Sequence, residues 1–447
     1  MSPEAMMVEF DAQIVPILKR LGLPSPDLDV ELCETPAVVA YKAWREFPVR
    51  YPHWSSGKRL EFLEDAAKKP FLFFDIRGVP GRMTWLPISR SRALACFTWL
   101  HTRIHHAFTE SNIAYQNAFL RITPEQVRDH ARCVRALVNQ YGLDVIEHTI
   151  SSAHKVRRQW GLDVAPEGGI LSILKDPALN PRMPSWRRDI LQMVEDEWPL
   201  IAADEYLSLC DEGFTMWAQM KVLHELIFPA ENAVDISRII AQLLMLPQNP
   251  MVGIRPHLVG FWMFASVEAR FGSAECLAVA QNCLDDSDFV RAYLTQDVAE
   301  QCGLGTASGT KISRGNLVVN ELPDDPQEFQ IIKEVLAQNI GRERHPKIRI
   351  LGVDGDGTLS LEHIFEGKYL NQRIAMDHIV PDIADLWGNP VTLRFRDLQK
   401  APQRQGEPIR GWIEVEETAD PATGDIVRKT LGDFHPFTQD QPRLPGM

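Results

Sequence analysis

Two histidines four residues apart are the strongest indication of chemistry in this sequence. His101 and His105 occur in "LHTRIHHAFTESN" (100–112), where apolar residues recur at helical spacing. Residues i and i+4 share one face of a helix, so the two imidazoles are able to reach one metal ion. His106 points elsewhere on the same helix. The alternative is a polar helix face on which histidines occur by chance, and the spacing leaves both interpretations open.

A second indication is an acidic pair in an otherwise apolar helical segment. Asp211 and Glu212 precede Gly213 in "DEGFTMWAQMKVLHELIF". A carboxylate in such a run is either a cap at a helix break or a buried functional group. We predict the second for Glu212, as a metal ligand and a catalytic residue. The end of the segment begins like the zinc-protease motif HExxH, but Phe228 replaces the second histidine, so we interpret His224 as a surface or interface residue.

Two further pairs of side chains complete the candidate site. Glu147 and His154 are seven residues apart in "VIEHTISSAHKV", on one side of a predicted helix. They fit metal ligands, an acid/base pair or a buried salt bridge, of which the salt bridge is the commonest. We take Glu147 as a candidate catalytic residue and His154 as a candidate metal ligand. His53 and Lys58 in the loop "HWSSGK" are candidate catalytic residues, because loops that combine such types often form sites.

Apolar spacing predicts a helical body that positions these residues and extends to about residue 305. A Gly/Ser-rich connector follows at 306–316. Segments 317–398 then read strand, helix, two strands around the Asp-Gly turn "DGDGT", helix and strand, which is the ferredoxin-like α+β order βαββαβ. Residues 399–447 form a peripheral tail with one hairpin. We therefore expect a mainly α N-terminal domain and a smaller α+β C-terminal domain.

Composition excludes several classes of protein. The 447 residues carry a net charge of −13, which argues against binding to nucleic acid or anionic lipid. The seven cysteines form no CxxC pair, as in a cytoplasmic protein with reduced thiols. The first residues lack the features of a signal peptide, and no apolar run is long enough to span a membrane. We expect a cytoplasmic protein.

Several phrases, in their order along the chain, resemble the SpoVR family of bacterial proteins, named for a stage V sporulation protein. "YPHWSSGK" (51–58) is similar to the family's YxHWSFGK, and "QYGLDVIEHTISSAHKV" (140–156) to a block that ends in AHAL. "DEGFTMWAQ" (211–219) is similar to NEGWAxxWH. The segment 356–393 is similar to the family's C-terminal ending. The resemblance covers most of the chain.

The same phrases show where this chain departs from the family pattern. The family's NEG begins with Asp211 here, and the histidine that ends NEGWAxxWH becomes Gln219. The family's NPY becomes Arg255-Pro256-His257. Cys-Glu before YG becomes Leu137-Val138. The chain is therefore identified as a divergent member, and any site that requires the replaced residues is expected to be altered.

The resemblance implies two alternative functions. In the first, His101, His105, His154 and Glu212 hold a divalent metal such as zinc, in a layout similar to gluzincins. The protein would then be a metal-dependent hydrolase linked to the cell envelope, spore cortex or stress, although Thr102 stands at the position of the HExxH glutamate. In the second, it is a non-catalytic regulatory or scaffold subunit that acts with a PrkA-type serine kinase and a von Willebrand-type protein.

Overall fold

The computed structural model describes most of the chain as two compact units. The described residues are 3–34, 76–77, 83–88, 91–158, 169–226, 230–245, 255–304, 306–307, 320–321, 326–365, 370, 375, 379–400 and 409–436. Unit 1 comprises Met1–Cys133 and Pro199–Arg342, and unit 2 comprises Val134–Trp198 and Glu343–Met447. The units thus alternate along the chain. The domain bounds expected from the sequence, which are consecutive, stay a prediction.

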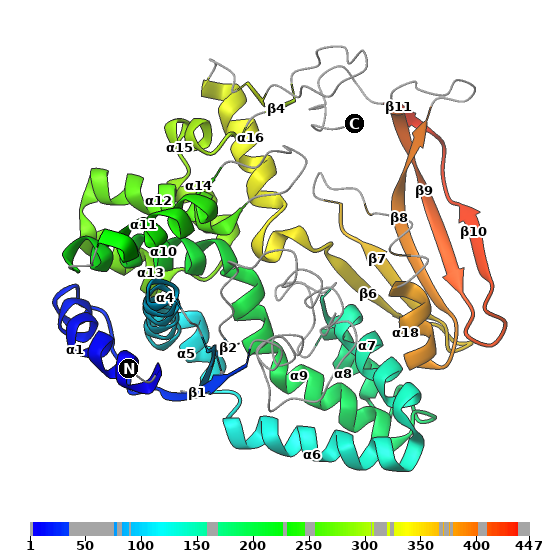
Figure 1. Cartoon of the computed structure of the whole chain (residues 1–447). Helices are drawn as coiled ribbons and strands as arrows, with labels where there is room; N and C mark the ends of the chain where they lie inside the picture. Colours follow the sequence, from blue (N-terminus) through cyan, green and yellow to red (C-terminus); the bar gives the residue numbers. More distant parts are fainter. Residues whose placement is uncertain are drawn as a thin grey trace, which may run out of the picture. The chain divides into compact units, whose positions relative to one another are not determined.

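Unit 1 is mainly helical, as the sequence predicts, and contains the elements that matter for the site. Its central helices are α4 (Arg92–Ser111), α10 (Ser208–Glu225) and α12 (Pro256–Phe271). Figure 1 shows α10 and α12 among the green helices, with α4 next to them. The other elements of this unit are α1 (Pro3–Arg20), β1 (Asp29–Cys33), β2 (Ile76–Arg77), β3 (Met83–Pro87), α5 (Ile113–Phe119), α11 (Ala230–Leu243), α13 (Ser273–Asn282), α14 (Asp286–Tyr293), α15 (Gln296–Gln301), β4 (Thr306–Ala307), β5 (Asn320–Glu321) and α16 (Pro326–Gln338).

Helix α4 is buried along almost its whole length. The Ser91 side chain caps its N-terminus by accepting a hydrogen bond from the Leu94 amide. The α1 carboxylate of Asp11 accepts from Arg103 Nε and from Trp99 Nε1, each at 2.6 Å. Because the Arg103 guanidinium is nearly inaccessible to solvent, this pairing compensates a buried charge and fixes α1 against α4.

Helices α10 and α12 cross at two glycines. A Cβ atom on Gly213 would lie 2.4 Å from the Cα and carbonyl carbon of Gly260. A Cβ atom on Gly260 would lie 2.4 Å from the Leu209 carbonyl oxygen. No side chain fits at either position, so the two backbones approach as closely as helices can. The contact brings the N-terminal turn of α12 next to the first half of α10.

Unit 2 combines helices with a C-terminal sheet. The sheet has the order β10-β9-β8-β7-β6, with β11 paired to β9. Strands β7 and β8 are parallel and are connected through α18, whereas the other neighbours are antiparallel. The helix and strand bounds are α6 (Pro124–Tyr141, shared with unit 1), α7 (Leu143–Arg158), α8 (Gly169–Lys175), α9 (Ser185–Tyr206, shared with unit 1), η1 (Gly341–Arg344, shared with unit 1), β6 (Ile348–Val353), β7 (Leu359–His363), α18 (Val380–Trp387), β8 (Val391–Lys400), β9 (Ile409–Ala419), β10 (Ile426–Thr430) and β11 (His435–Pro436).

The expected ferredoxin-like arrangement is not confirmed. Residues Asn320–Glu321, in the first expected strand, pair with β4 and not with the sheet. The sheet instead gains β9 and β10, the two segments of the tail for which the sequence suggested a hairpin. Apolar side chains of α18, including the fully buried Trp387, pack on the sheet in the core of unit 2. The sequence thus predicted the two hairpins, β6–β7 and β9–β10, but not how they combine in one sheet.

No helix in the described ranges is long and apolar enough to cross a membrane.

Candidate metal centre

The site forms where α4 and α10 face one another in unit 1. His101 and His105 lie one turn apart on α4 and are 2% and 3% exposed. Glu212 lies on α10 and is 28% exposed at its side chain. The two imidazoles are thus buried, and the carboxylate lies between them and solvent. The i, i+4 spacing places both rings on one face, as the sequence predicts.

An aspartate from α14 fixes the start of α10. Asp286 accepts hydrogen bonds from the Leu209 amide at 2.6 Å and the Cys210 amide at 2.9 Å. These amides belong to the first turn of α10 and have no partner within the helix. Burial raises the pKa of Asp286 to about 8, against the lowering effect of the two amides. The cap positions Glu212 less than one turn further along the helix.

Three donor atoms converge on one point. The Nε2 atoms of His101 and His105 are 3.0 Å apart. Glu212 Oε2 lies 3.3 Å from His105 Nε2 and 3.8 Å from His101 Nε2. Donors bound tetrahedrally to a metal at about 2.0–2.1 Å are separated by about 3.3–3.4 Å. The three distances scatter around that value, so the donors already lie nearly at the corners of a tetrahedral site.

The outer nitrogens of both imidazoles face hydrogen-bond acceptors. His101 Nδ1 lies 2.9 Å from Gln219 Oε1, and the same amide donates through its Nε2 to the Phe97 carbonyl at 2.9 Å. The carbonyl requires a donor, so the amide oxygen must face the ring. His105 Nδ1 lies 2.7 Å from the carboxylate of Asp211. Both Nδ1 atoms therefore carry hydrogen, which leaves the two Nε2 atoms, directed at one another, for protons or for a metal ion.

Two lone pairs that face one another at 3.0 Å repel unless a cation separates them. Glu212 adds its Oε2 oxygen to the same point, 3.0–3.8 Å from the Nε2 atoms of His257, His105 and His101. Burial raises the pKa of Glu212, but the imidazoles of His257 and His105 outweigh it and hold that pKa well below its usual range. The carboxylate is therefore ionised, and the cluster requires either protons or a metal ion for balance.

His257, in the N-terminal turn of α12, contacts Glu212 from outside the three-donor group. Its Nε2 lies 3.0 Å from Glu212 Oε2, and its ring stacks on that of His101 with planes 9° from parallel. The glycine contact between α10 and α12 makes this approach possible, because Gly213 follows Glu212 and Gly260 is three residues beyond His257. The side chain of His257 is 27% exposed. It lies on the solvent side of the carboxylate.

Among the described residues, the three-donor group contains none of the remaining sequence candidates. Glu147 and His154 lie on α7 in unit 2, where His154 is buried and burial raises the pKa of Glu147. Their predicted roles stay predictions. His53 and Lys58 fall outside the described residues. His106, next to the ligands, instead places its Nε2 2.7 Å from the Thr84 hydroxyl.

Three residues of the site were visible in the sequence only as departures from a pattern. Asp211, Gln219 and His257 replace the asparagine, histidine and tyrosine of the family phrases, and each contacts one of the three donors. The sequence suggested that such replacements alter the site. In the structure the three predicted donors lie together, and the replaced residues are the side chains that contact them. The spacing 211, 215, 219 on α10 was the available signal, because i, i+4, i+8 residues share one helical face. Thr215 is the middle member, 3.2 Å from His105 Nδ1.

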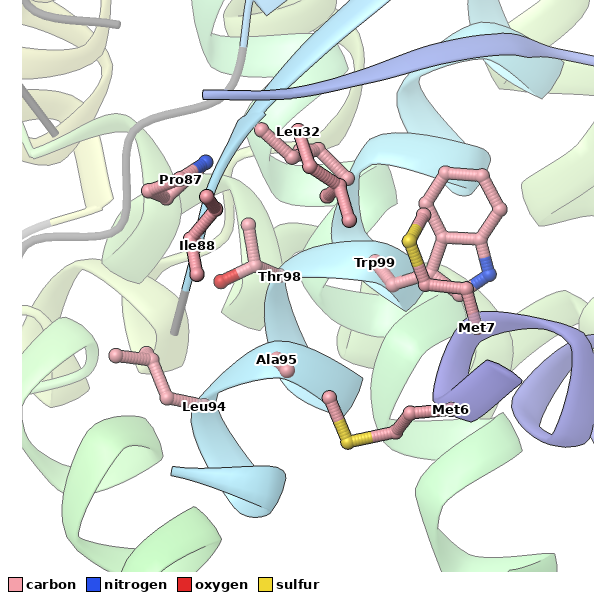
Figure 2. Close-up of a pocket in the computed structure, with 10 residues that line it drawn as sticks. Met6, Met7, Leu32, Pro87, Ile88, Leu94, Ala95, Thr98 and Trp99 are labelled. Carbon is pink, nitrogen blue, oxygen red and sulfur yellow. The ribbon is translucent and has the colours of Figure 1, made fainter. Parts of the chain in front are cut away.

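A pocket elsewhere in unit 1 lacks such chemistry. Apolar side chains of α1, β1, β3 and α4, among them Met6, Leu32 and Trp99, line it together with Thr98 (Figure 2). None of the described residues that line it is ionisable. The convergent donors on α4 and α10 are therefore the stronger candidate for function.

Comparison with known proteins identifies the family. The family described as SpoVR like protein matches residues 4–167 and 161–345, which is most of the chain. No curated protein and no solved structure matches. The kinase and von Willebrand-type partners stay predictions of the resemblance. The chain belongs to the SpoVR-like protein family.

Proposed function

We propose that this protein is a metal-dependent hydrolase whose ion is held by His101, His105 and Glu212. The observation that carries the proposal is the convergence of two imidazole lone pairs and one ionised carboxylate oxygen within 4.8 Å of one another. Two histidines and one glutamate are a ligand set of catalytic zinc sites, and the absence of thiolate ligands from this set is typical of catalysis.

The charges of the site favour a divalent ion. Glu212 and Asp211 bring two carboxylates to the site, and imidazoles with hydrogen on Nδ1 and a metal ion on Nε2 are neutral ligands. A divalent cation balances these charges. Without it, protons on the imidazoles must do so, and metal binding therefore releases protons.

The chemistry of such an ion is the polarisation of a bound water or of a substrate carbonyl or phosphoryl oxygen. The protein's own residues hold and orient it. Asp211 is engaged with His105 Nδ1 and Thr215, and is therefore not placed as the proton acceptor that the missing HExxH glutamate would supply. The resemblance suggests a substrate in the cell envelope.

Metal analysis and thermal unfolding test the metal site. We expect purified protein to contain about one divalent ion per chain. After chelation and dialysis, added Zn²⁺ at 100 times its Kd should stabilise the folded protein by about 2.7 kcal/mol. His101→Ala and Glu212→Ala should each abolish that gain, whereas His224→Ala should retain it, because His224 is no member of the group. A wild-type protein without bound metal and without a Zn²⁺-dependent shift would refute the proposal.

The hydrolytic role requires a separate assay. Purified peptidoglycan incubated with the metal-loaded protein should release soluble fragments, and the His101→Ala protein should release none. Release by both proteins would indicate a contaminant. Metal binding without release from peptidoglycan would retain the ion and reject the envelope substrate.

A further inference from the structure

We infer that each of the three ligands has its own positioning residue, and that a fourth coordination position stays open on the side of His257. The positioning residues are Gln219 for His101, Asp211 for His105 and His257 for Glu212. This inference rests on the proposed metal site and adds which residues set its geometry and where an exogenous ligand enters.

Gln219 positions His101 through two hydrogen bonds. Its amide is anchored to the Phe97 carbonyl on α4, and its oxygen faces Nδ1 of an imidazole one turn further along α4. The side chain is fully buried, so water does not compete for either bond. Gln219 thus fixes both the tautomer and the orientation of the ring, which is the role of the partners that surround metal-bound histidines.

Asp211 fixes the tautomer and orientation of the His105 ring through its carboxylate. The 2.7 Å contact between its carboxylate and Nδ1 is that of a charge-assisted hydrogen bond. The Thr215 hydroxyl, 3.4 Å from the same carboxylate oxygen and 3.2 Å from Nδ1, supports this geometry from one turn away. An imidazole that is hydrogen-bonded to a carboxylate is a stronger metal ligand than one hydrogen-bonded to an amide. His105 is therefore the stronger of the two imidazole ligands.

His257 contacts the carboxylate and lies outside the ligand group. The described donors that lie within 4.8 Å of one another are His101, His105 and Glu212, without His257. The lone pair of an imidazole nitrogen lies in the plane of its ring. The rings of His101 and His257 are stacked and nearly parallel, with centroids 5.9 Å apart, whereas those of His101 and His105 are at 83°. The rings of His101 and His105 direct their Nε2 atoms at one point, and His257, outside the 4.8 Å group, is assigned as the partner of the carboxylate.

The exposure of the side chains locates the open position. His101 and His105 are almost completely buried, while Glu212 and His257 are 28% and 27% exposed. Solvent thus approaches the donors past His257. Three protein ligands and one open position are the arrangement of catalytic zinc sites, whereas structural sites are closed by four protein ligands.

Cobalt(II) is the probe for the positioning residues. Gln219→Leu and Asp211→Leu should each weaken Co²⁺ binding by about 10- to 100-fold. Gln219→Glu and Asp211→Asn retain an acceptor for Nδ1 and should recover most of the affinity. His106→Gln is the matched control, a buried histidine of α4 outside the group. It should bind as the wild type does. Equal affinity in the leucine variants and the wild type would overturn the positioning roles while leaving the metal site intact.

Visible absorption of the Co²⁺ protein tests the open position. Azide should shift the bands of the wild-type protein, because it occupies the fourth position. His257→Phe removes the contact with Glu212 and should weaken Co²⁺ binding by about 10- to 100-fold, while the bands of its Co²⁺ form should still respond to azide. If only His257→Phe responds to azide, His257 is a fourth ligand and the open position is refuted. A wild-type protein that binds no Co²⁺ would instead reject the proposed metal site itself.

Discussion

Substitution of either glycine at the crossing of α10 and α12 tests how the site is assembled. Gly213→Ala and Gly260→Ala each add one methyl group where the two backbones touch. In Gly213→Ala the new Cβ atom would lie 2.4 Å from two backbone atoms of Gly260. In Gly260→Ala it would lie 2.4 Å from the Leu209 carbonyl oxygen and 2.6 Å from Gly213 Cα. Backbone atoms have no rotamer by which to avoid it.

The magnitude follows from two opposing effects. Carbon atoms in contact are about 3.5–4.0 Å apart, so the helices must separate by about 1 Å or more. Overpacking of this kind costs about 1–3 kcal/mol. Alanine in place of a helical glycine returns about 1 kcal/mol. Because backbone meets backbone here, we expect the upper end of the cost and a net loss of about 2 kcal/mol. The same separation would lengthen the 3.0 Å contact between His257 and Glu212.

Urea unfolding and Co²⁺ titration of the two variants are the assay. We expect a lower midpoint of unfolding, weaker Co²⁺ binding, and altered Co²⁺ bands. Gly355→Ala is the control, because its Cβ atom would meet nothing within 4 Å. Alanine variants as stable as the wild type, with unchanged Co²⁺ affinity, would refute the view that this contact assembles the site.

Three other measurements follow from buried charges. Burial and Arg396 lower the pKa of His363 from 6.5 to about 4, so unfolding binds a proton between these values. The free energy of unfolding should therefore fall by up to about 3 kcal/mol as pH drops from 6.5 to 4. His363→Gln should remove this pH dependence, and an unchanged dependence would contradict the role of His363. The pKa of Asp286 is raised from 3.8 to about 8, so its contribution to stability is lost as pH rises across that window. Asp286→Asn should flatten this pH dependence in urea unfolding. An identical pH profile would show that Asp286 does not cause it. Asp11→Ala leaves Arg103 without its carboxylate and should cost about 3 kcal/mol, and a loss below about 0.5 kcal/mol would show that the pairing contributes little.

Helical periodicity predicted which side chains of α4 and α10 share a face. The i, i+4 pair of histidines and the acidic residue of the "DEG" phrase were both predicted as ligands, and the structure places their donor atoms together. This works because helix geometry fixes which neighbours in sequence share a face. The family resemblance was also legible from phrases in order, and the family comparison confirms it.

The sequence did not show how segments far apart along the chain pack together. His154 has the residue type and helical face of a ligand, and its role stays a prediction; the sequence did not show that α7 belongs to unit 2. Similarly, the order of elements suggested a ferredoxin-like sheet that is not confirmed, because β8 pairs in parallel with β7 and on its other side with β9. Strand order is decided by packing over the whole domain.

The sequence by itself indicated the three candidate donors, and the tertiary structure decided what surrounds them. Asp211, Gln219 and His257 have no shared motif, because what unites them is the imidazole or carboxylate that each contacts across a helix interface. In the sequence these residues were departures from the family phrases, which suggested an altered site. The crossing at Gly213 and Gly260 brings α12 close enough for His257 to reach Glu212, and only the packed backbones reveal that distance.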